Sequence, residues 1–201
     1  SSGFVGISSS DVVMSSSDNC GVESSVTNVS LFGCGSVGSQ GVSVTVTDVN
    51  GNSVVSSTSV SVVDMSSPDV VSMDVSVSLD GNGDGMIAVS DADDGSSDNC
   101  AFTLSVNQSM FGCSDVGDVN VLLSGVDASG NSASSLFVVS VSDSVDPSVT
   151  LESGVMLALN SSGFVGISSS DVVMSSSDNC GVQGSVTNVS LFGCGSVGSQ
   201  G

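Results

Sequence analysis

The residues best suited to chemistry in this chain are its cysteines and the acidic and amide side chains beside them. The six cysteines are Cys20, Cys34, Cys100, Cys113, Cys180 and Cys194. They form three pairs, and the first cysteine of each pair ends the phrase Ser-Ser-Asp-Asn-Cys. Neighbouring thiols form disulfides or bind soft metals, whereas carboxylate and amide oxygens bind hard cations such as calcium.

The spacing within each pair predicts a local disulfide. The second cysteine follows the first by 13 or 14 positions, which gives Cys20–Cys34, Cys100–Cys113 and Cys180–Cys194. A bridge that closes a loop of about 15 residues stabilises a fold by about 3 kcal/mol in the chain-entropy treatment. Zinc is the alternative, but two thiols without any His cannot complete a tetrahedral site. Disulfides also predict an oxidising, extracellular location.

The composition disfavours catalysis and nucleic-acid binding. The chain has no Lys, Arg or His, so no Ser has a basic partner to activate it. A carboxylate pair for glycoside hydrolysis is conceivable in Asp-Ala-Asp-Asp at 91–94, but no other pattern indicates a cleft there. We therefore expect no enzyme. No cation is present to meet phosphate, and no apolar run reaches the 18 or more residues of a membrane span.

The formal net charge of −21 has two explanations. One is an acidic surface protein that uses metal ions where other proteins use salt bridges. The other is a sequence read from a density map, in which exposed Lys and Arg side chains fade and are written as Ser, Asp or Val.

The chain repeats itself with a period of 80 residues. Residues 1–41 and 161–201 differ only at Glu23/Gln183 and Ser24/Gly184, and the copy at 81–121 is more divergent. Prolines between the strand patterns mark the boundaries. We expect a first cut repeat at 1–65, a complete repeat at 66–145 and a third cut repeat at 146–201.

Within a repeat, apolar residues alternate with polar ones, which predicts short antiparallel strands. In the complete repeat the expected strands are 69–72, 74–79, 86–90, 102–107, 119–126 and 134–142. Six or seven strands in about 80 residues indicate an all-β fold, a series of tandem immunoglobulin-like sandwiches strung end to end.

The stretch from Asp80 to Asp91 has the spacing of a calcium loop, with Asn82 and Asp84 at the third and fifth positions. The third repeat has Phe164 where the second has Asp84, so the pattern is not repeated. A glycine-rich hairpin turn is the other interpretation of these residues.

The combination of Asp-Asn-Cys, Leu-Phe-Gly-Cys-Gly-Ser-Val-Gly, Thr-Asp-Val-Asn-Gly-Asn and Val-Val-Asp resembles the repeats of large Bacteroidota cell-surface adhesins of the gliding-motility type. It resembles hyalin repeats more loosely. The resemblance spans the chain and implies immunoglobulin-like repeats in a secreted filament or stalk that serves attachment or movement over surfaces.

Immunoglobulin-like topology predicts calcium at the junctions between repeats. The loop that holds Asp98 and Asn99, and the hairpin that holds Asp127 and Asn131, should lie at the end where the preceding linker arrives. Carboxylates gathered there repel one another unless a cation neutralises them. The predicted ligands are Asp64, Asp69, Asp98, Asn99, Asp127 and Asn131 at the first junction; Asp143, Asp146, Asp178 and Asn179 at the second; and Asp18, Asn19, Asp48 and Asn52 in the first repeat. Alternatively, the acids point into water and the Asn residues only close turns.

The sequence thus predicts a structural and adhesive segment of an extracellular, cell-surface filament or stalk. Its expected partners are neighbouring repeats of the same long chain, copies of itself, and an extracellular surface or glycan. A calcium-dependent glycan-binding module is the alternative, although few aromatic residues are present for sugar stacking. A matrix or surface-layer protein is a third possibility.

Overall fold

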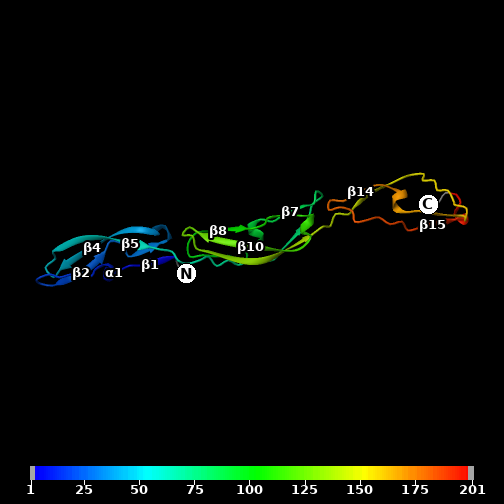
Figure 1. Ribbon diagram of the computed structural model, residues 1–201. Coiled ribbons are helices and arrows are strands. Elements are labelled where there is room, and N and C mark those ends of the chain that lie inside the picture. Colours follow the sequence, from blue (N-terminus) through cyan, green and yellow to red (C-terminus); the bar gives the residue numbers. More distant parts are fainter. Residues whose placement is uncertain (1–2, 199–201) are drawn as a thin grey trace. The chain divides into compact units, whose positions relative to one another are not determined.

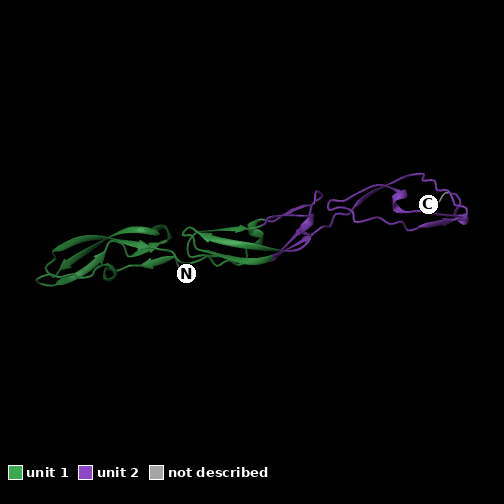
Figure 2. Cartoon of the chain, viewed as in Figure 1, with its two compact units in different colours: residues 1–73, 88–107, 120–137 green, residues 74–87, 108–119, 138–201 purple. Residues whose placement is uncertain are grey.

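The computed structural model describes residues 3–198 and is all-β, with short helical turns between the strands (Figure 1). The chain divides into two compact units (Figure 2). Unit 1 comprises 1–73, 88–107 and 120–137, and unit 2 comprises 74–87, 108–119 and 138–201. The first boundary between sequence repeats therefore lies inside unit 1, and the second lies inside unit 2. Among the described residues, no helix is long and apolar enough to cross a membrane.

The first repeat contains two small sheets. Strand β1 pairs with β3, and β4 lies between β2 and β5 in a three-stranded antiparallel sheet. The elements are β1 (Phe4–Gly6), α1 (Ser9–Val12), β2 (Val22–Thr27), β3 (Leu31–Gly33), η1 (Cys34–Ser36), β4 (Gly38–Asp48) and β5 (Ser53–Val62).

The second repeat has the largest sheet, with strand order β6-β11-β10-β8, and a two-stranded sheet of β7 and β9. The elements are β6 (Val75–Ser78), β7 (Asp84–Met86), α2 (Val89–Ala92), β8 (Phe102–Val106), β9 (Met110–Gly112), η2 (Cys113–Asp115), β10 (Gly117–Asp127) and β11 (Ser132–Ser142). Strand β6 is parallel to β11, unlike the antiparallel pairing expected from sequence. Parallel pairing requires a long connection, which the other strands of this repeat supply.

The third repeat contains two two-stranded sheets, β12–β14 and β13–β15. The elements are β12 (Ser148–Leu151), β13 (Phe164–Gly166), η3 (Ser169–Asp171), β14 (Val173–Ser177), β15 (Leu191–Gly193) and η4 (Cys194–Ser196). Every sheet of the described residues is built within one sequence repeat.

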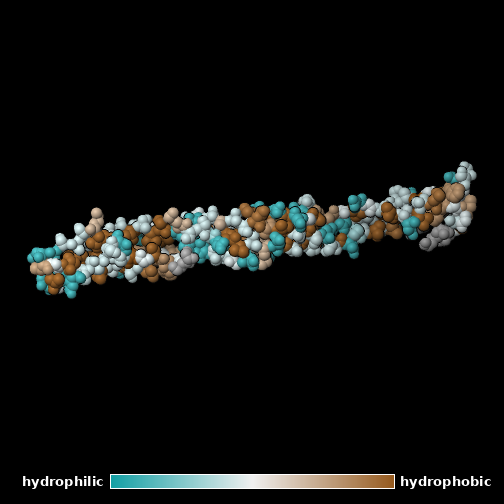
Figure 3. All heavy atoms as spheres, turned by 90° about the horizontal axis from the view of Figure 1, so that it is seen from below, coloured by the Kyte–Doolittle hydropathy of each residue, from teal (hydrophilic) through white to brown (hydrophobic). Residues whose placement is uncertain are grey.

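Packing is closest in the second repeat. Val121, Leu123 and Val139 have no exposed surface there, because alternate side chains of β10 and β11 face inward. In the first repeat Val42 and Val44 of β4 are buried in the same way, whereas β5 is almost wholly exposed. No described residue of 146–198 is buried. Apolar side chains accordingly appear on the surface among polar ones (Figure 3).

Two strand predictions in the second repeat were wrong. Residues 69–72 form only isolated bridges, and the expected strand at 86–90 is replaced by the end of β7 and the one-turn helix α2. The helix begins there because the Asp91 carboxylate accepts the backbone N–H of Ala88 at 2.7 Å and so caps the first turn. Strand β9 was not predicted, since three residues are too few to show an alternation.

Candidate functional site

The disulfides connect successive repeats, which corrects the predicted pairing. Cys34 is bonded to Cys100, and Cys113 is bonded to Cys180. Strand β8 lies between Cys100 and Cys113 in the sequence and is about 17 Å long at the usual rise per residue. It carries the chain away from Cys100, and Cys100 is not bonded to Cys113. Among the described residues, Cys20 and Cys194 are free and exposed.

A glycine accompanies the second cysteine of each pair. Gly3, Gly83 and Gly163 all have positive φ, and an added Cβ on each would collide with the sulfur of Cys34, Cys113 and Cys194 respectively. At the first two positions the Cβ would also meet the backbone carbonyl of Asn99 or Asn179. Glycine thus lets the Asp-Asn-Cys loop of the next repeat approach the cysteine closely.

Three carboxylates meet beside the first disulfide, in unit 1. One oxygen from each of Asp64, Asp98 and Asp127 lies within 4.8 Å of the others. Asp64 follows β5, Asp98 precedes Cys100, and Asp127 ends β10. Asp127 is placed by the strand periodicity, because it lies on the same face as the buried residues Val121 and Leu123.

Asp127 and Asn131 form a rigid hairpin end. The Asp127 carboxylate accepts the backbone N–H groups of Ser129 and Asn131, and the Asn131 amide at 2.8 Å. Although burial raises the pKa of Asp127, these hydrogen bonds lower it more, and the carboxylate stays ionised. The Asn131 amide also donates to the backbone carbonyl of Asp64 at 3.1 Å, which ties the hairpin to the incoming linker.

Unpartnered oxygens are concentrated at the junctions. In the described part of the chain, the buried side-chain atoms without a hydrogen-bond partner are Asp64 Oδ2, Asn99 Oδ1, Asp178 Oδ1 and Asn179 Oδ1. All four are acceptors, and a buried acceptor without a donor is costly. Carboxylate and amide oxygens are the ligands that calcium takes, so this donor set fits a hard divalent cation.

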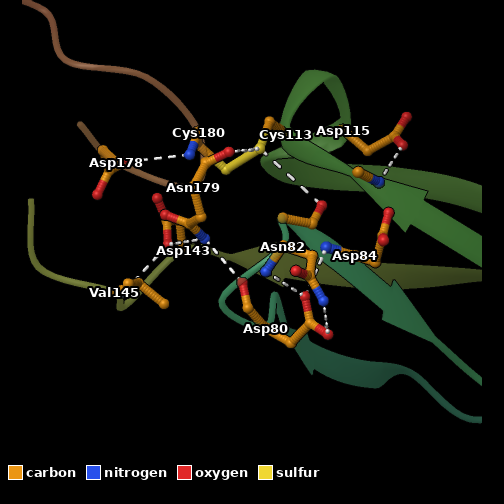
Figure 4. The surroundings of a disulfide bond; sticks show 12 residues. Asp80, Asn82, Asp84, Cys113, Asp115, Asp143, Val145, Asp178, Asn179 and Cys180 are labelled. Atoms are coloured by element: carbon orange, nitrogen blue, oxygen red, sulfur yellow. Dashed lines mark hydrogen bonds between the residues drawn. A yellow bond between two sulfur atoms is a disulfide. The ribbon is translucent and has the colours of Figure 1, made fainter.

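The second junction, in unit 2, repeats the disulfide, the Asn amide and the unpartnered oxygens of the first (Figure 4). The Asn179 amide lies between two acceptors, donating to the Asp143 carboxylate at 3.0 Å and to the backbone carbonyl of Asp80 at 2.9 Å. The Asp178 carboxylate accepts the backbone N–H of Cys180 at 3.0 Å, which orients the bonded cysteine. At the first junction, Asn99 likewise donates to the Asp64 carboxylate at 3.1 Å, and Asp98 accepts from Cys100.

The predicted residues of the first repeat have the same local structure. Asp48 is buried, and the Asn52 amide donates to its carboxylate at 2.8 Å, which holds the pKa of Asp48 below its usual value. Asp18 accepts the backbone N–H of Cys20 at 2.8 Å. Asp18 and Asn19 are exposed, unlike their half-buried counterparts in the second and third repeats.

Two predicted ligands lie outside these clusters. Asp69 and Asp146 are both exposed, and Asp69 contributes only backbone hydrogen bonds, to Ser97. Asp69 is not part of the carboxylate group around Asp64 in unit 1, and Asp146, in unit 2, is exposed beside Pro147.

The stretch from Asp80 to Asp91 folds as a hairpin turn rather than as a continuous calcium loop. The Asp80 carboxylate accepts the backbone N–H groups of Asn82 at 2.8 Å and Asp84 at 3.1 Å, and hydrogen bonds from Asp84 and Asn82 lower the pKa of Asp80. Strand β7 starts at Asp84, and Asp91 caps α2.

Some junction contacts were not predicted from the sequence. These are the Asp80 carbonyl, which accepts from Asn179, and the three glycines beside the cysteines. A signal for the glycines was present, because Gly3, Gly83 and Gly163 follow the period of 80.

The sequence matches no protein-family model and no curated protein.

Proposed function

We propose that this chain is a structural and adhesive segment of a long extracellular filament or stalk at a cell surface, built from tandem immunoglobulin-like repeats. The observation that carries the proposal is that each disulfide joins one repeat to the next. Bridges within repeats would stabilise each fold separately, whereas bridges between repeats fix how successive repeats are joined. Disulfides persist in oxidising compartments, and the two bridges therefore fit an extracellular protein.

Repetition of the whole structural plan supports the same function. Asp-Asn-Cys, the glycine beside the second cysteine and the Asx hairpin recur with the sequence period. An added repeat therefore brings both halves of another junction, and the length of such a protein grows by addition of identical parts. A binding module would instead concentrate unusual residues in one repeat.

Calcium is the second part of the proposal. A cation at the first junction would bind oxygens of Asp64, Asp98, Asp127 and Asn99, relieve the repulsion among the carboxylates and satisfy the unpartnered oxygens. Asp143, Asp178 and Asn179 offer a smaller set at the second junction. The bound ion would hold the linker against the loops of the next repeat.

The surface location is tested with antibodies raised against residues 66–145. We expect them to label intact, unpermeabilised source cells and filaments seen by electron microscopy, and to reduce attachment of cells to surfaces. Labelling that requires permeabilisation, or attachment unchanged by saturating antibody, would contradict the proposal.

The calcium part is tested by thermal unfolding with added calcium and with a chelator. A ligand that binds only the folded state at 100 times its Kd stabilises by about 2.7 kcal/mol. We expect calcium to raise the Tm of the wild type and to have a smaller effect on Asp64→Asn. Asp94→Asn is the matched control, because Asp94 is exposed and lies outside the junction. Equal Tm values with calcium and chelator would exclude the ion.

A further inference from the structure

One tripeptide recurs directly before a short strand in each repeat. The sequence Asn-X-Ser precedes β3, β9 and β15, at residues 28–30, 107–109 and 188–190. The middle residue X is never Pro, so each copy has the form of the acceptor motif for N-linked glycans in secreted proteins. A fourth match, at Asn160, does not recur, because Asp80 stands one period earlier.

In the second repeat the amide oxygen of the motif is engaged and the amide nitrogen is not. The backbone N–H of Leu122 donates to Asn107 Oδ1 at 2.8 Å, and the Asn107 N–H donates to the Leu122 carbonyl at 3.2 Å. The acceptor of a backbone N–H is the oxygen of the amide, which leaves Nδ2 as the remaining atom. Asn107 is exposed, and among the described residues its Nδ2 has no hydrogen-bond partner.

The first repeat holds its asparagine in the same way. The backbone N–H of Ser43 donates to Asn28 Oδ1 at 2.8 Å, and the Asn28 N–H donates to the Ser43 carbonyl at 2.9 Å. Asn28 is exposed, and within residues 3–198 its Nδ2 has no partner either. Both repeats therefore offer the same nitrogen to an external reactant. Because the second repeat is complete and has a repeat on either side, this exposure does not arise from the ends of the sequence.

The serine of the motif is retained without a structural reason. Between the first two repeats Thr-Asn-Val-Ser-Leu becomes Val-Asn-Gln-Ser-Met, so every residue around Asn and Ser changes. The contacts with β4 and β10 account for the Asn. They do not account for the Ser, because Ser30 and Ser109 are exposed and their hydroxyls have no hydrogen-bond partner in the described part of the chain. A glycosylation enzyme does require a hydroxyl at this position.

We propose that Asn28, Asn107 and, by the same motif, Asn188 carry N-linked glycans. The donor is an oligosaccharide joined through its C1 atom to a lipid pyrophosphate, and a transferase of the secretory compartment catalyses the step. Nδ2 attacks C1, the nitrogen–carbon bond forms, and the bond from C1 to the pyrophosphate oxygen breaks. The lipid pyrophosphate leaves with the electron pair, and the amide nitrogen loses one proton.

This inference goes beyond the filament function. It requires passage through a secretory compartment, which the two disulfides also indicate. One bulky, hydrated glycan would then stand on each period of the chain. In unit 1, Leu31 follows the motif directly and is 56% exposed, so a glycan on Asn28 would shield this apolar side chain.

The first test is mass spectrometry of reduced peptides from the protein isolated from its source. The chain has no Lys or Arg for trypsin, so a protease that cuts before Asp is used. It yields residues 18–47, with Asn28, and residues 98–114, with Asn107. We expect both peptides to carry the mass of an oligosaccharide and fragmentation to place it on the Asn. Peptides without sugar, or a sugar placed on a Ser, would overturn the inference.

The second test uses variants secreted from a eukaryotic cell line, which supplies the transferase. Ser109→Ala should abolish the sugar on 98–114 and leave the sugar on 18–47, whereas Ser109→Thr should keep both. Ser105→Ala is the matched control, because Ser105 is exposed on β8 and lies outside the motif. The Ser109 hydroxyl makes no hydrogen bond among the described residues, so Ser109→Ala should fold as the wild type does and retain the Cys113–Cys180 disulfide.

A Ser109→Ala chain that keeps its sugar on 98–114 would contradict the inference, as would a Ser105→Ala chain that loses it. Antibody labelling of intact cells does not depend on these outcomes, so the filament function stands or fails separately.

Discussion

The two junctions share a disulfide and an Asn amide but differ in their acidic groups. At the first, Asn99 donates to Asp64, and the hairpin residues Asp127 and Asn131 complete the cluster. At the second, Asn179 donates both to Asp143 and to the carbonyl of Asp80. The positions one period after Asp127 and Asn131 lie past residue 201.

The parts that the two junctions share are the disulfide, the glycine and the Asn amide, and these attach one repeat to the next. At the first junction Asp127 adds negative charge where the Cys34–Cys100 disulfide already joins the two repeats. Its carboxylate therefore contributes to cation binding more than to attachment of the repeats.

The largest expected effect is common to both junctions. Removing either bridge, by Cys34→Ser with Cys100→Ser or by Cys113→Ser with Cys180→Ser, should destabilise its unit by about 4 kcal/mol. The two losses should be similar, because the bonded residues are separated by 66 and 67 positions. Hydrogen exchange read separately from the peptides of each unit measures both. A loss confined to one unit would mean that the junctions are not built alike.

The Asn amides should contribute unequally. Asn179→Ala removes two hydrogen bonds and should cost about 2 kcal/mol in calcium-free buffer, whereas Asn99→Ala removes one and should cost about 1 kcal/mol. Urea unfolding followed by circular dichroism measures both, with Asn50→Ala as the control. Equal costs would show that the Asp80 carbonyl contributes nothing.

Calcium affinity should distinguish the junctions. Asp127→Asn should weaken binding at the first junction by at least about tenfold and leave the second unchanged, because the charge of the ligand set controls affinity. Isothermal titration of the variant and of Asp94→Asn tests this. If Asp127→Asn binds as the wild type does, the hairpin acid is not a ligand and only fixes the turn.

The smallest effect is on pH dependence. Hydrogen bonds lower the pKa of Asp48, chiefly from Asn52, and that of Asp127 against the effect of burial. A lowered folded-state pKa contributes stability that is present above the usual value of 3.8 and is lost as the pH falls through the folded-state value. Unfolding temperatures measured down to acidic pH should therefore fall less steeply for Asp127→Asn than for the wild type. Parallel curves would contradict this assignment.

Sequence periodicity predicts the four strands of the main sheet in the second repeat. Strands β6, β8, β10 and β11 lie where the alternation of apolar and polar residues placed them, because each of these strands buries one face. Short elements such as β7, β9 and α2 have too few residues to show a period, and α2 begins where the Asp91 carboxylate caps its first turn.

Cysteine pairing could not be derived from spacing. In a chain with two cysteines per period, a local pair and a pair between repeats recur equally regularly, so regularity does not choose between them. Strand β8 decides the outcome, because it carries the chain away from Cys100 before Cys113 is reached. The meeting of Asp64, Asp98 and Asp127 followed instead from strand direction, which sequence does indicate.

The pairing has a mechanical consequence. A force applied along the chain passes from Cys34 directly to Cys100 through the sulfur–sulfur bond, and from Cys113 directly to Cys180. The 66 positions between Cys34 and Cys100 are thereby shielded from the load, and they withhold about 230 Å of contour length at 3.3–3.6 Å per residue. When the chain is pulled under oxidising conditions, only the short stretch between the two cysteines of each period can extend. Reduction releases the hidden length, and the same chain becomes several times more extensible.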